Sequence, residues 1–180
     1  MPHDTAAAVV RQWLESLVIE LNLCPFAGRE LRNDRVRFAV TGATTEDELL
    51  IALRTELELL DANTSIETTL LIHPEVLCDF ADYNQFLDAA DSLLRYMEVE
   101  GIYQVASFHP DYQFGGTEPN DVENYTNRAP YPLLHILREA SLERAIAEFP
   151  DVEQIPERNI TLMNSMGAEQ LQRLWQAWER

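Results

Sequence analysis

Two histidines stand at matching places in two apolar runs. Each run has the composition of a strand and ends in histidine, proline and an acid: His73-Pro74-Glu75 after the first run and His109-Pro110-Asp111 after the second. A neutral imidazole can bind a metal ion or transfer protons near neutral pH. A helix-like segment separates the runs, which predicts parallel strands whose carboxyl ends share one sheet edge. We therefore expect His73 and His109 to converge there, although each one alone also fits a capping role.

A third histidine, His135, follows Pro132, a residue that suits the first position of a helix. In a helix running from Pro132 to Glu148, Glu139 lies one turn after His135 on the same face. Such a pair can supply two metal ligands, or a base and the carboxylate that orients it, but the spacing is also common on ordinary helix surfaces. We predict metal ligands at His73, His109 and His135. The predicted catalytic groups are His109, His135 and Glu139.

A long polar stretch between the second histidine and this helix offers groups for binding a substrate. Asn127 and Arg128 lie in a proline-rich segment, and arginine presents a planar fork to carboxylates or phosphates. An internal salt bridge from Arg128 is the competing interpretation. The stretch begins at Asp111 and Tyr112, and Gly115-Gly116 would let it move as a lid. The predicted substrate-binding residues are Asp111, Tyr112, Asn127 and Arg128.

Cys24 precedes Pro25, which would open a turn of helix with Cys24 at its cap. A thiol at that position can have a lowered pKa and become nucleophilic, so Cys24 joins the catalytic candidates. A buried structural cysteine beside Phe26 is the alternative. The chain has two cysteines, Cys24 and Cys78, without metal-type spacing, which is typical of a reducing cytosol.

The composition is that of a soluble globular protein, with 46% hydrophobic and 24% charged residues. The formal net charge is -18, and all 13 basic residues are arginine. Such acidity argues against nucleic acid or an anionic membrane as partner, because phosphate binding depends on clustered cations. The N-terminus lacks the pattern of a signal peptide, and no apolar run approaches the about 20 residues that span a bilayer. We predict a cytoplasmic location.

Hydrophobic periodicity predicts the elements that position these residues. Strands are expected over 35–40, 66–72 and 102–108. Helices are expected over 5–24, 45–60, 79–98, 132–148 and 156–167, with a last helix carrying Leu171, Leu174, Trp175 and Trp178. Trp175 and Trp178 belong either to the core or to the seam of a homodimer.

This order predicts an α/β fold in a single domain over residues 1–180. We expect a small three-layer domain with a short, mainly parallel sheet and C-terminal helices, since strand–helix–strand units form parallel pairs. The alternative is a ferredoxin-like α+β fold in which Asn159–Met163 adds an antiparallel strand.

Three functions fit these residues. The first is an enzyme that acts on a small polar or anionic metabolite through a histidine-centred site, with or without a divalent zinc, iron or manganese ion. The second is a non-catalytic ligand-binding or regulatory module that uses the same groups. The third is a thiol redox role for Cys24, which lacks a neighbouring cysteine in sequence to resolve an oxidised thiol.

Three motifs, in this order, resemble a bacterial family of unknown function, DUF1415. They are Leu21-Asn22-Leu23-Cys24-Pro25-Phe26-Ala27, Ser107-Phe108-His109-Pro110-Asp111-Tyr112-Gln113-Phe114 and Thr126-Asn127-Arg128-Ala129-Pro130-Tyr131-Pro132-Leu133-Leu134-His135. The resemblance implies a single-domain cytosolic protein and brings no activity with it. Ala129 stands where serine is expected in many relatives, so no role is assigned to that hydroxyl.

Overall fold

A mixed sheet organises the molecule. The computed structural model describes residues 3–149 and 151–178. Within them the strands are β1 (Val36–Val40), β2 (Thr68–Ile72), β3 (Tyr103–Phe108) and β4 (Leu133–Arg138). Their order across the sheet is β1-β2-β4-β3. The first two strands pair in parallel, whereas β4 runs antiparallel to both β2 and β3. The predicted α/β class is confirmed.

The expectation of a mainly parallel sheet is wrong. The three predicted strands do run in one direction, but β4 lies between β2 and β3 and leaves one parallel pair, β1 with β2. The sequence predicts a helix over 132–148, whereas its first part, Leu133–Arg138, forms β4. The apolar residues of this segment are compatible with the periodicity of a helix and with that of a strand. The segment forms a strand because it pairs with β2 on one edge and with β3 on the other. The ferredoxin-like alternative is also wrong, because residues 159–163 lie within a helix.

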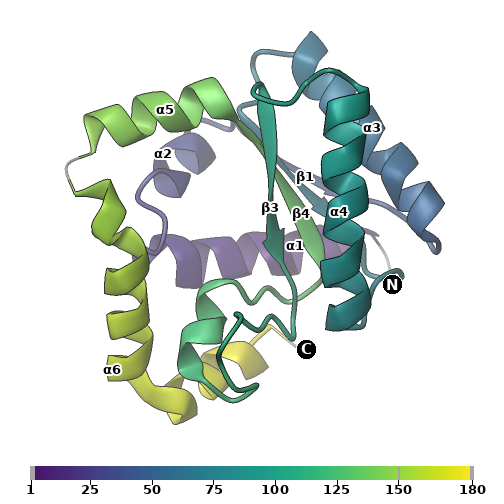
Figure 1. Ribbon diagram of the computed structural model, residues 1–180. Coiled ribbons are helices and arrows are strands. Elements are labelled where there is room, and N and C mark those ends of the chain that lie inside the picture. The colour runs from purple at the N-terminus through teal and green to yellow at the C-terminus, as the bar shows by residue number, and fades with distance from the viewer. Residues whose placement is uncertain (1–2, 150, 179–180) are drawn as a thin grey trace.

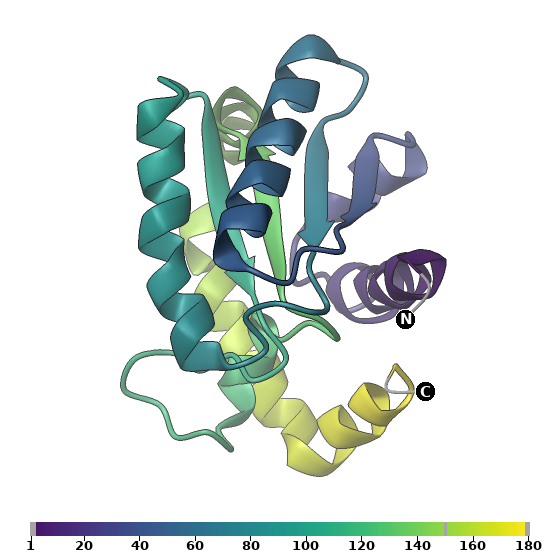
Figure 2. The ribbon, with the colours of Figure 1, turned by 90° about the vertical axis from the view of Figure 1, so that its right-hand side faces the viewer.

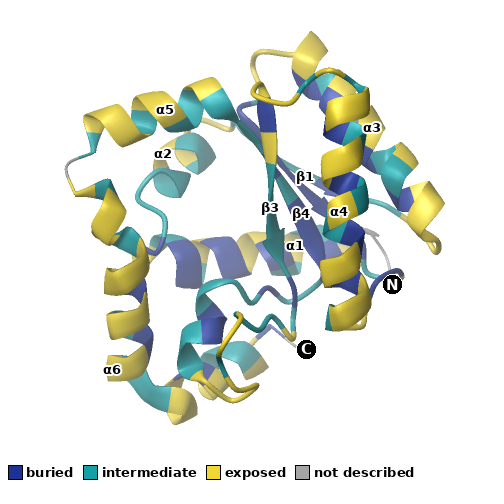
Figure 3. Cartoon of the chain, in the orientation of Figure 1, coloured by how far each residue is buried: buried dark blue, intermediate teal, exposed yellow. Residues whose placement is uncertain are grey.

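Helices cover both faces of this sheet (Figures 1 and 2). On one face lie α3 (Glu46–Ala62) and α4 (Phe80–Tyr96). On the other face lies α1 (His3–Trp13), which continues into a π-helical segment, η1 (Leu14–Ile19). The central strand β2 is buried along its whole length, whereas the outer sides of α3 and α4 are exposed (Figure 3).

The remaining helices surround the second face. They are α2 (Ala27–Arg32), the 3₁₀ helices η2 (Val122–Thr126) and η3 (Val152–Gln154), α5 (Glu139–Glu148) and α6 (Ile155–Gln176). Gly167, with φ 76°, interrupts α6 where the sequence predicts the end of a helix. Trp178 is buried in the core cluster on this face. None of the helices in the described residues combines the length and apolar character needed to cross a bilayer.

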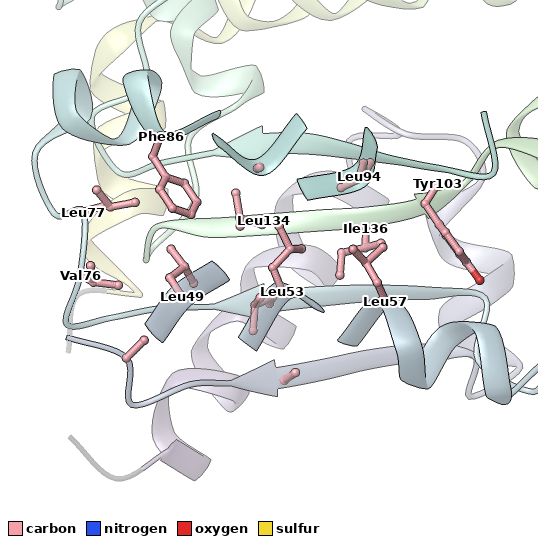
Figure 4. Packing of buried hydrophobic residues seen from close by; sticks show 14 of the residues in the cluster. Leu49, Leu53, Leu57, Val76, Leu77, Phe86, Leu94, Tyr103, Leu134 and Ile136 are labelled. Atoms are coloured by element: carbon pink, nitrogen blue, oxygen red, sulfur yellow. The ribbon is translucent and has the colours of Figure 1, made fainter. Parts of the chain in front are cut away.

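Strand alternation divides the core into two clusters. Leu134 and Ile136 of β4 pack with Leu53 and Leu57 of α3 in the first cluster (Figure 4). Leu133 belongs to the second cluster, with residues of α1 and η1. Because successive side chains of a strand point to opposite faces, His135 shares the face of Leu133. The alternation of side chains along β4 determines on which face of the sheet each predicted site residue lies, and therefore which of these residues can come into contact.

Candidate functional site

The structure brings His73 and His109 together beside α4. His73 follows β2 and His109 follows β3, and both imidazoles contact the ring of Tyr83. The ring centroids lie 5.8 Å apart for His73 and Tyr83, and 5.1 Å apart for His109 and Tyr83. The predicted convergence of these two histidines is therefore present, although β4 separates the strands that carry them.

Both ring nitrogens of His109 form hydrogen bonds with the backbone. Its Nδ1 accepts a hydrogen bond from the Asp111 amide at 3.0 Å, so the ring proton is on Nε2, which donates to the Leu77 carbonyl at 3.1 Å. The side chain is fully buried, and burial lowers its pKa. A neutral imidazole with both nitrogens engaged has no lone pair left for a metal or a proton. The contacts of His109 are those of a structural residue.

His73 has one engaged nitrogen. Its Nδ1 donates to the Val76 carbonyl at 2.9 Å, which leaves Nε2 as an acceptor. Nε2 is buried and has no hydrogen-bond partner among the described residues. Burial is the largest cause that lowers the pKa of His73, to about 4. Together the two histidines hold the turn between β2 and α4 against the end of β3.

His135 lies on the opposite face of the sheet. It belongs to β4, and Glu139 is the first residue of α5, so the predicted helical pair of His135 and Glu139 is wrong. The parity of β4 directs His135 away from the face on which His73 and His109 meet Tyr83. No group of three histidine, cysteine or acidic side chains within residues 3–149 and 151–178 is arranged to hold a metal ion. The three predicted ligands are therefore not brought to one site.

The predicted substrate-binding residues form hydrogen bonds within the loop that follows β3 and with the end of that strand. Arg128 donates from Nε to the Tyr112 carbonyl at 3.3 Å and from Nη2 to the Pro119 carbonyl at 2.6 Å. Asn127 donates to the Ser107 carbonyl at 3.1 Å. Asp111 is exposed, and its amide bonds to His109. These contacts fasten the loop to the end of β3.

Asn124 organises the same loop, a role that the sequence alone does not reveal. Its buried side chain accepts from the Phe114 amide at 3.0 Å and from Thr117 Oγ1 at 2.8 Å, and it donates to the Glu118 carbonyl at 2.9 Å. Asparagine is suited to such local bonds because one side chain carries both donors and acceptors. In sequence, the only signal was an asparagine within a polar stretch.

A cavity of about 290 Å³ lies over His135. Its floor is the second face of the sheet, and its walls come from α1, η1, α2 and α5. Figure 1 shows α2 and α5 close together, on the side of the strands away from α3 and α4. Most of the lining is apolar: Trp13, Leu14, Val18, Phe26, Ala27, Val36, Leu70, Ala106, Phe108, Leu137, Leu142 and Ala145. The polar residues of the lining are Cys24, Glu30, Glu67, Thr68, His135, Arg138 and Ser141.

His135 presents a hydrogen-bond acceptor in this cavity. Its Nε2 lies 2.7 Å from Thr68 Oγ1, and the same oxygen lies 2.6 Å from the Ile136 carbonyl. The hydroxyl must donate to the carbonyl, since two acceptors at that distance would repel each other. His135 therefore donates from Nε2 and keeps the lone pair on Nδ1. Burial lowers the pKa of His135 to about 4, so the ring is neutral at pH 7.

Cys24 and His135 are the two predicted catalytic candidates that share this cavity. Cys24 is half-buried in its wall, next to Phe26. It is a free thiol, as is Cys78, which is exposed in the turn between β2 and α4. His109 and Glu139 are absent from the cavity lining, and so are the four predicted substrate-binding residues.

The comparisons place the chain in a family. Residues 5–173 match the family described as "Protein of unknown function (DUF1415)". The chain matches no curated protein and no solved structure. The family match covers the whole sheet and nearly all of the helices around it, including all the residues that line the cavity. The chain therefore belongs to the DUF1415 family.

Proposed function

We propose that this protein binds a small, mainly apolar molecule in the cavity between the sheet and helices α1, α2 and α5. The observation that carries the proposal is the neutral imidazole of His135, which leaves Nδ1 as an acceptor in a largely apolar wall. Small-molecule sites commonly combine apolar walls with a few polar groups that orient the ligand. A hydrogen-bond donor on the ligand would meet His135.

The low pKa of His135 favours binding over acid–base catalysis. An efficient general base has a pKa near the working pH, whereas burial holds the pKa of His135 at about 4. The apolar lining favours an apolar ligand over the strongly polar metabolite expected from the sequence. The thiol redox role of Cys24 gains no support from a second cysteine, because Cys24 lines the cavity and Cys78 lies in the turn that leads to α4. The ligand-binding hypothesis therefore has the strongest support.

Benzyl alcohol is a suitable probe, because it joins an apolar ring to one hydroxyl donor. We expect it to perturb the amide NMR signals of residues around the cavity in a saturable manner. Ala145→Trp, which fills the cavity from α5, should abolish these shifts. Ala147→Trp places the same ring on an exposed position of α5 and should leave them intact.

His135→Phe tests the anchoring bond. It removes the acceptor, while Thr68 keeps its bond to the Ile136 carbonyl. Loss of one buried hydrogen bond should weaken benzyl alcohol binding by about tenfold. Unchanged binding in the Ala145→Trp variant would exclude the cavity as the site, and unchanged affinity in His135→Phe would exclude the anchor.

A further inference from the structure

A second, polar hollow of about 270 Å³ adjoins the cavity. The two share part of their lining, contributed by Phe26, Glu30, Glu67, Ser141 and Ala145. We call the second hollow the vestibule; its further lining includes charged residues of α2 and α5. An apolar chamber beside a charged one is suited to a ligand with an apolar body and a charged head group.

Two carboxylates lie where the cavity and the vestibule meet. Glu67 is 9% exposed, and its Oε2 accepts a hydrogen bond from Arg35 Nη2. The other oxygen, Oε1, is buried and has no hydrogen-bond partner among the described residues. Glu30 Oε2 is also buried and without a hydrogen-bond partner among the described residues, although it lies 3.4 Å from Arg35 Nη1. Buried polar atoms without partners are rare and costly, so these two oxygens need an explanation.

The local charges do not balance in the buried part of this cluster. Glu30 and Glu67 share one guanidinium, that of Arg35, which leaves one negative charge in excess. Arg29 lies 3.5 Å from Glu30 Oε1, but its side chain is 66% exposed. Solvent screens a charge in that position, so Arg29 offsets little of the buried excess.

Two arginines of the vestibule, Arg29 and Arg144, are less suited to bind a ligand than the two carboxylates, because they already have protein partners. Arg29 also approaches Glu148, at 3.9 Å, and Arg144 donates to Ser141 Oγ at 2.9 Å. Arg29 and Arg144 are exposed, whereas Glu30 Oε2 and Glu67 Oε1 are buried and belong to residues that line both the cavity and the vestibule. The vestibule therefore favours a cationic head group over an anionic one.

We infer that the ligand is a hydrophobic ammonium compound, with its apolar body in the cavity and its ammonium group against Glu67 and Glu30. An ammonium offers three N–H donors and one positive charge, which answer the unpaired oxygens and the excess negative charge. The inference rests on the proposed function, since the apolar body needs the cavity.

Three probes that share one ring separate the possibilities: benzylammonium, benzyl alcohol and benzoate. We expect benzylammonium to bind about tenfold more tightly than benzyl alcohol, and benzoate to bind most weakly. Titration followed by amide NMR signals gives the three affinities under one set of conditions. Ala145→Trp should abolish binding of all three compounds.

Glu67→Gln tests the head-group contact at constant side-chain size. It should reduce the affinity for benzylammonium to that for benzyl alcohol and leave the affinity for the alcohol unchanged. Glu58→Gln is the matched control, because Glu58 also pairs with an arginine, Arg54, but lies on the exposed side of α3. That variant should behave as the wild type, and unfolding curves establish that both variants are folded.

The two proposals fail in different ways. If benzyl alcohol binds and Ala145→Trp blocks it, but benzylammonium binds no more tightly, the ammonium inference is overturned while the cavity remains a binding site. Tightest binding of benzoate would also overturn it and would assign the head group to the arginines. If none of the three compounds binds, the proposed function fails and the inference fails with it.

Discussion

His73, His109 and His135 show that one residue type takes different roles according to the partner of its second ring nitrogen. His109 has a protein partner on both nitrogens, and His73 has one buried nitrogen without a partner. His135 has one engaged nitrogen and lines a cavity. A ligand can reach an imidazole only where space adjoins an unused lone pair. Of the three, His135 meets this condition.

The buried His73 should make the protein acid-sensitive. Its pKa is about 4 in the folded state, whereas an unfolded histidine titrates near its ordinary value of about 6.5. The unfolded chain therefore binds the proton first as pH falls. The stability due to neutral His73 is complete above about pH 6.5 and is lost as pH falls from there towards 4.

His73→Gln isolates this effect, because the acidic residues titrate alike in both proteins. Between pH 7 and pH 5 the wild type should lose about 2 kcal/mol more unfolding free energy than the variant. Urea unfolding at the two pH values measures the difference. Parallel losses in the two proteins would show that His73 does not retain its low pKa.

At the scale of elements, one hydroxyl ties a helix to two strands. Tyr83 of α4 donates to the Leu133 carbonyl at 2.8 Å and accepts from the Phe108 amide at 3.0 Å. Both partners lie at the end of the β3–β4 pair, next to the two buried histidines. These two hydrogen bonds fix the N-terminal part of α4 against the ends of β3 and β4.

Tyr83→Phe should lower the unfolding free energy by about 1–3 kcal/mol, because it leaves the half-buried Phe108 amide and the buried Leu133 carbonyl without their shared partner. Tyr96→Phe, at the other end of α4, removes a hydroxyl from a side chain that is 82% exposed and should change little. Denaturant unfolding compares the two variants. Equal stability of both would mean that the Tyr83 hydroxyl contributes nothing.

Elements with one clear period were predicted closely. The strands expected over 35–40, 66–72 and 102–108 are found at Val36–Val40, Thr68–Ile72 and Tyr103–Phe108. The helix expected over 45–60 is found as α3, which Thr45 caps, since its hydroxyl accepts from the Glu48 amide at 3.3 Å. These features depend on neighbours in sequence, so local pattern is sufficient to find them.

At the scale of the whole molecule, the net charge of -18 opposes compact folding. Several ion pairs, such as Arg54 with Glu58 and Arg173 with Glu169, join exposed side chains one turn apart and contribute little. Repulsion among the remaining acids acts over longer distances, and salt screens it.

Stability should therefore rise with ionic strength. Between about 0.01 M and about 0.15 M salt the screening length falls from about 30 Å to about 8 Å, which removes most of the long-range repulsion. The midpoint of urea unfolding measures the rise. In a double variant, Asp88→Asn with Asp91→Asn on the exposed side of α4, the same increase in salt should raise the unfolding midpoint by less than in the wild type. A midpoint that falls with added salt would show that attractive ion pairs outweigh the repulsion.

The amino-acid sequence by itself determined the residue types, the α/β class and the elements whose periodicity is unambiguous. It did not determine the position of β4, because the apolar residues of Leu133–Arg138 suit a helix as well as a strand. Only pairing with β2 and β3 makes that segment a strand and turns His135 towards the cavity. The contact between Arg35 and Glu67 likewise joins residues far apart along the chain. Tertiary structure decided these features because they arise from packing between segments that are distant along the chain. Local periodicity carries no information about such packing.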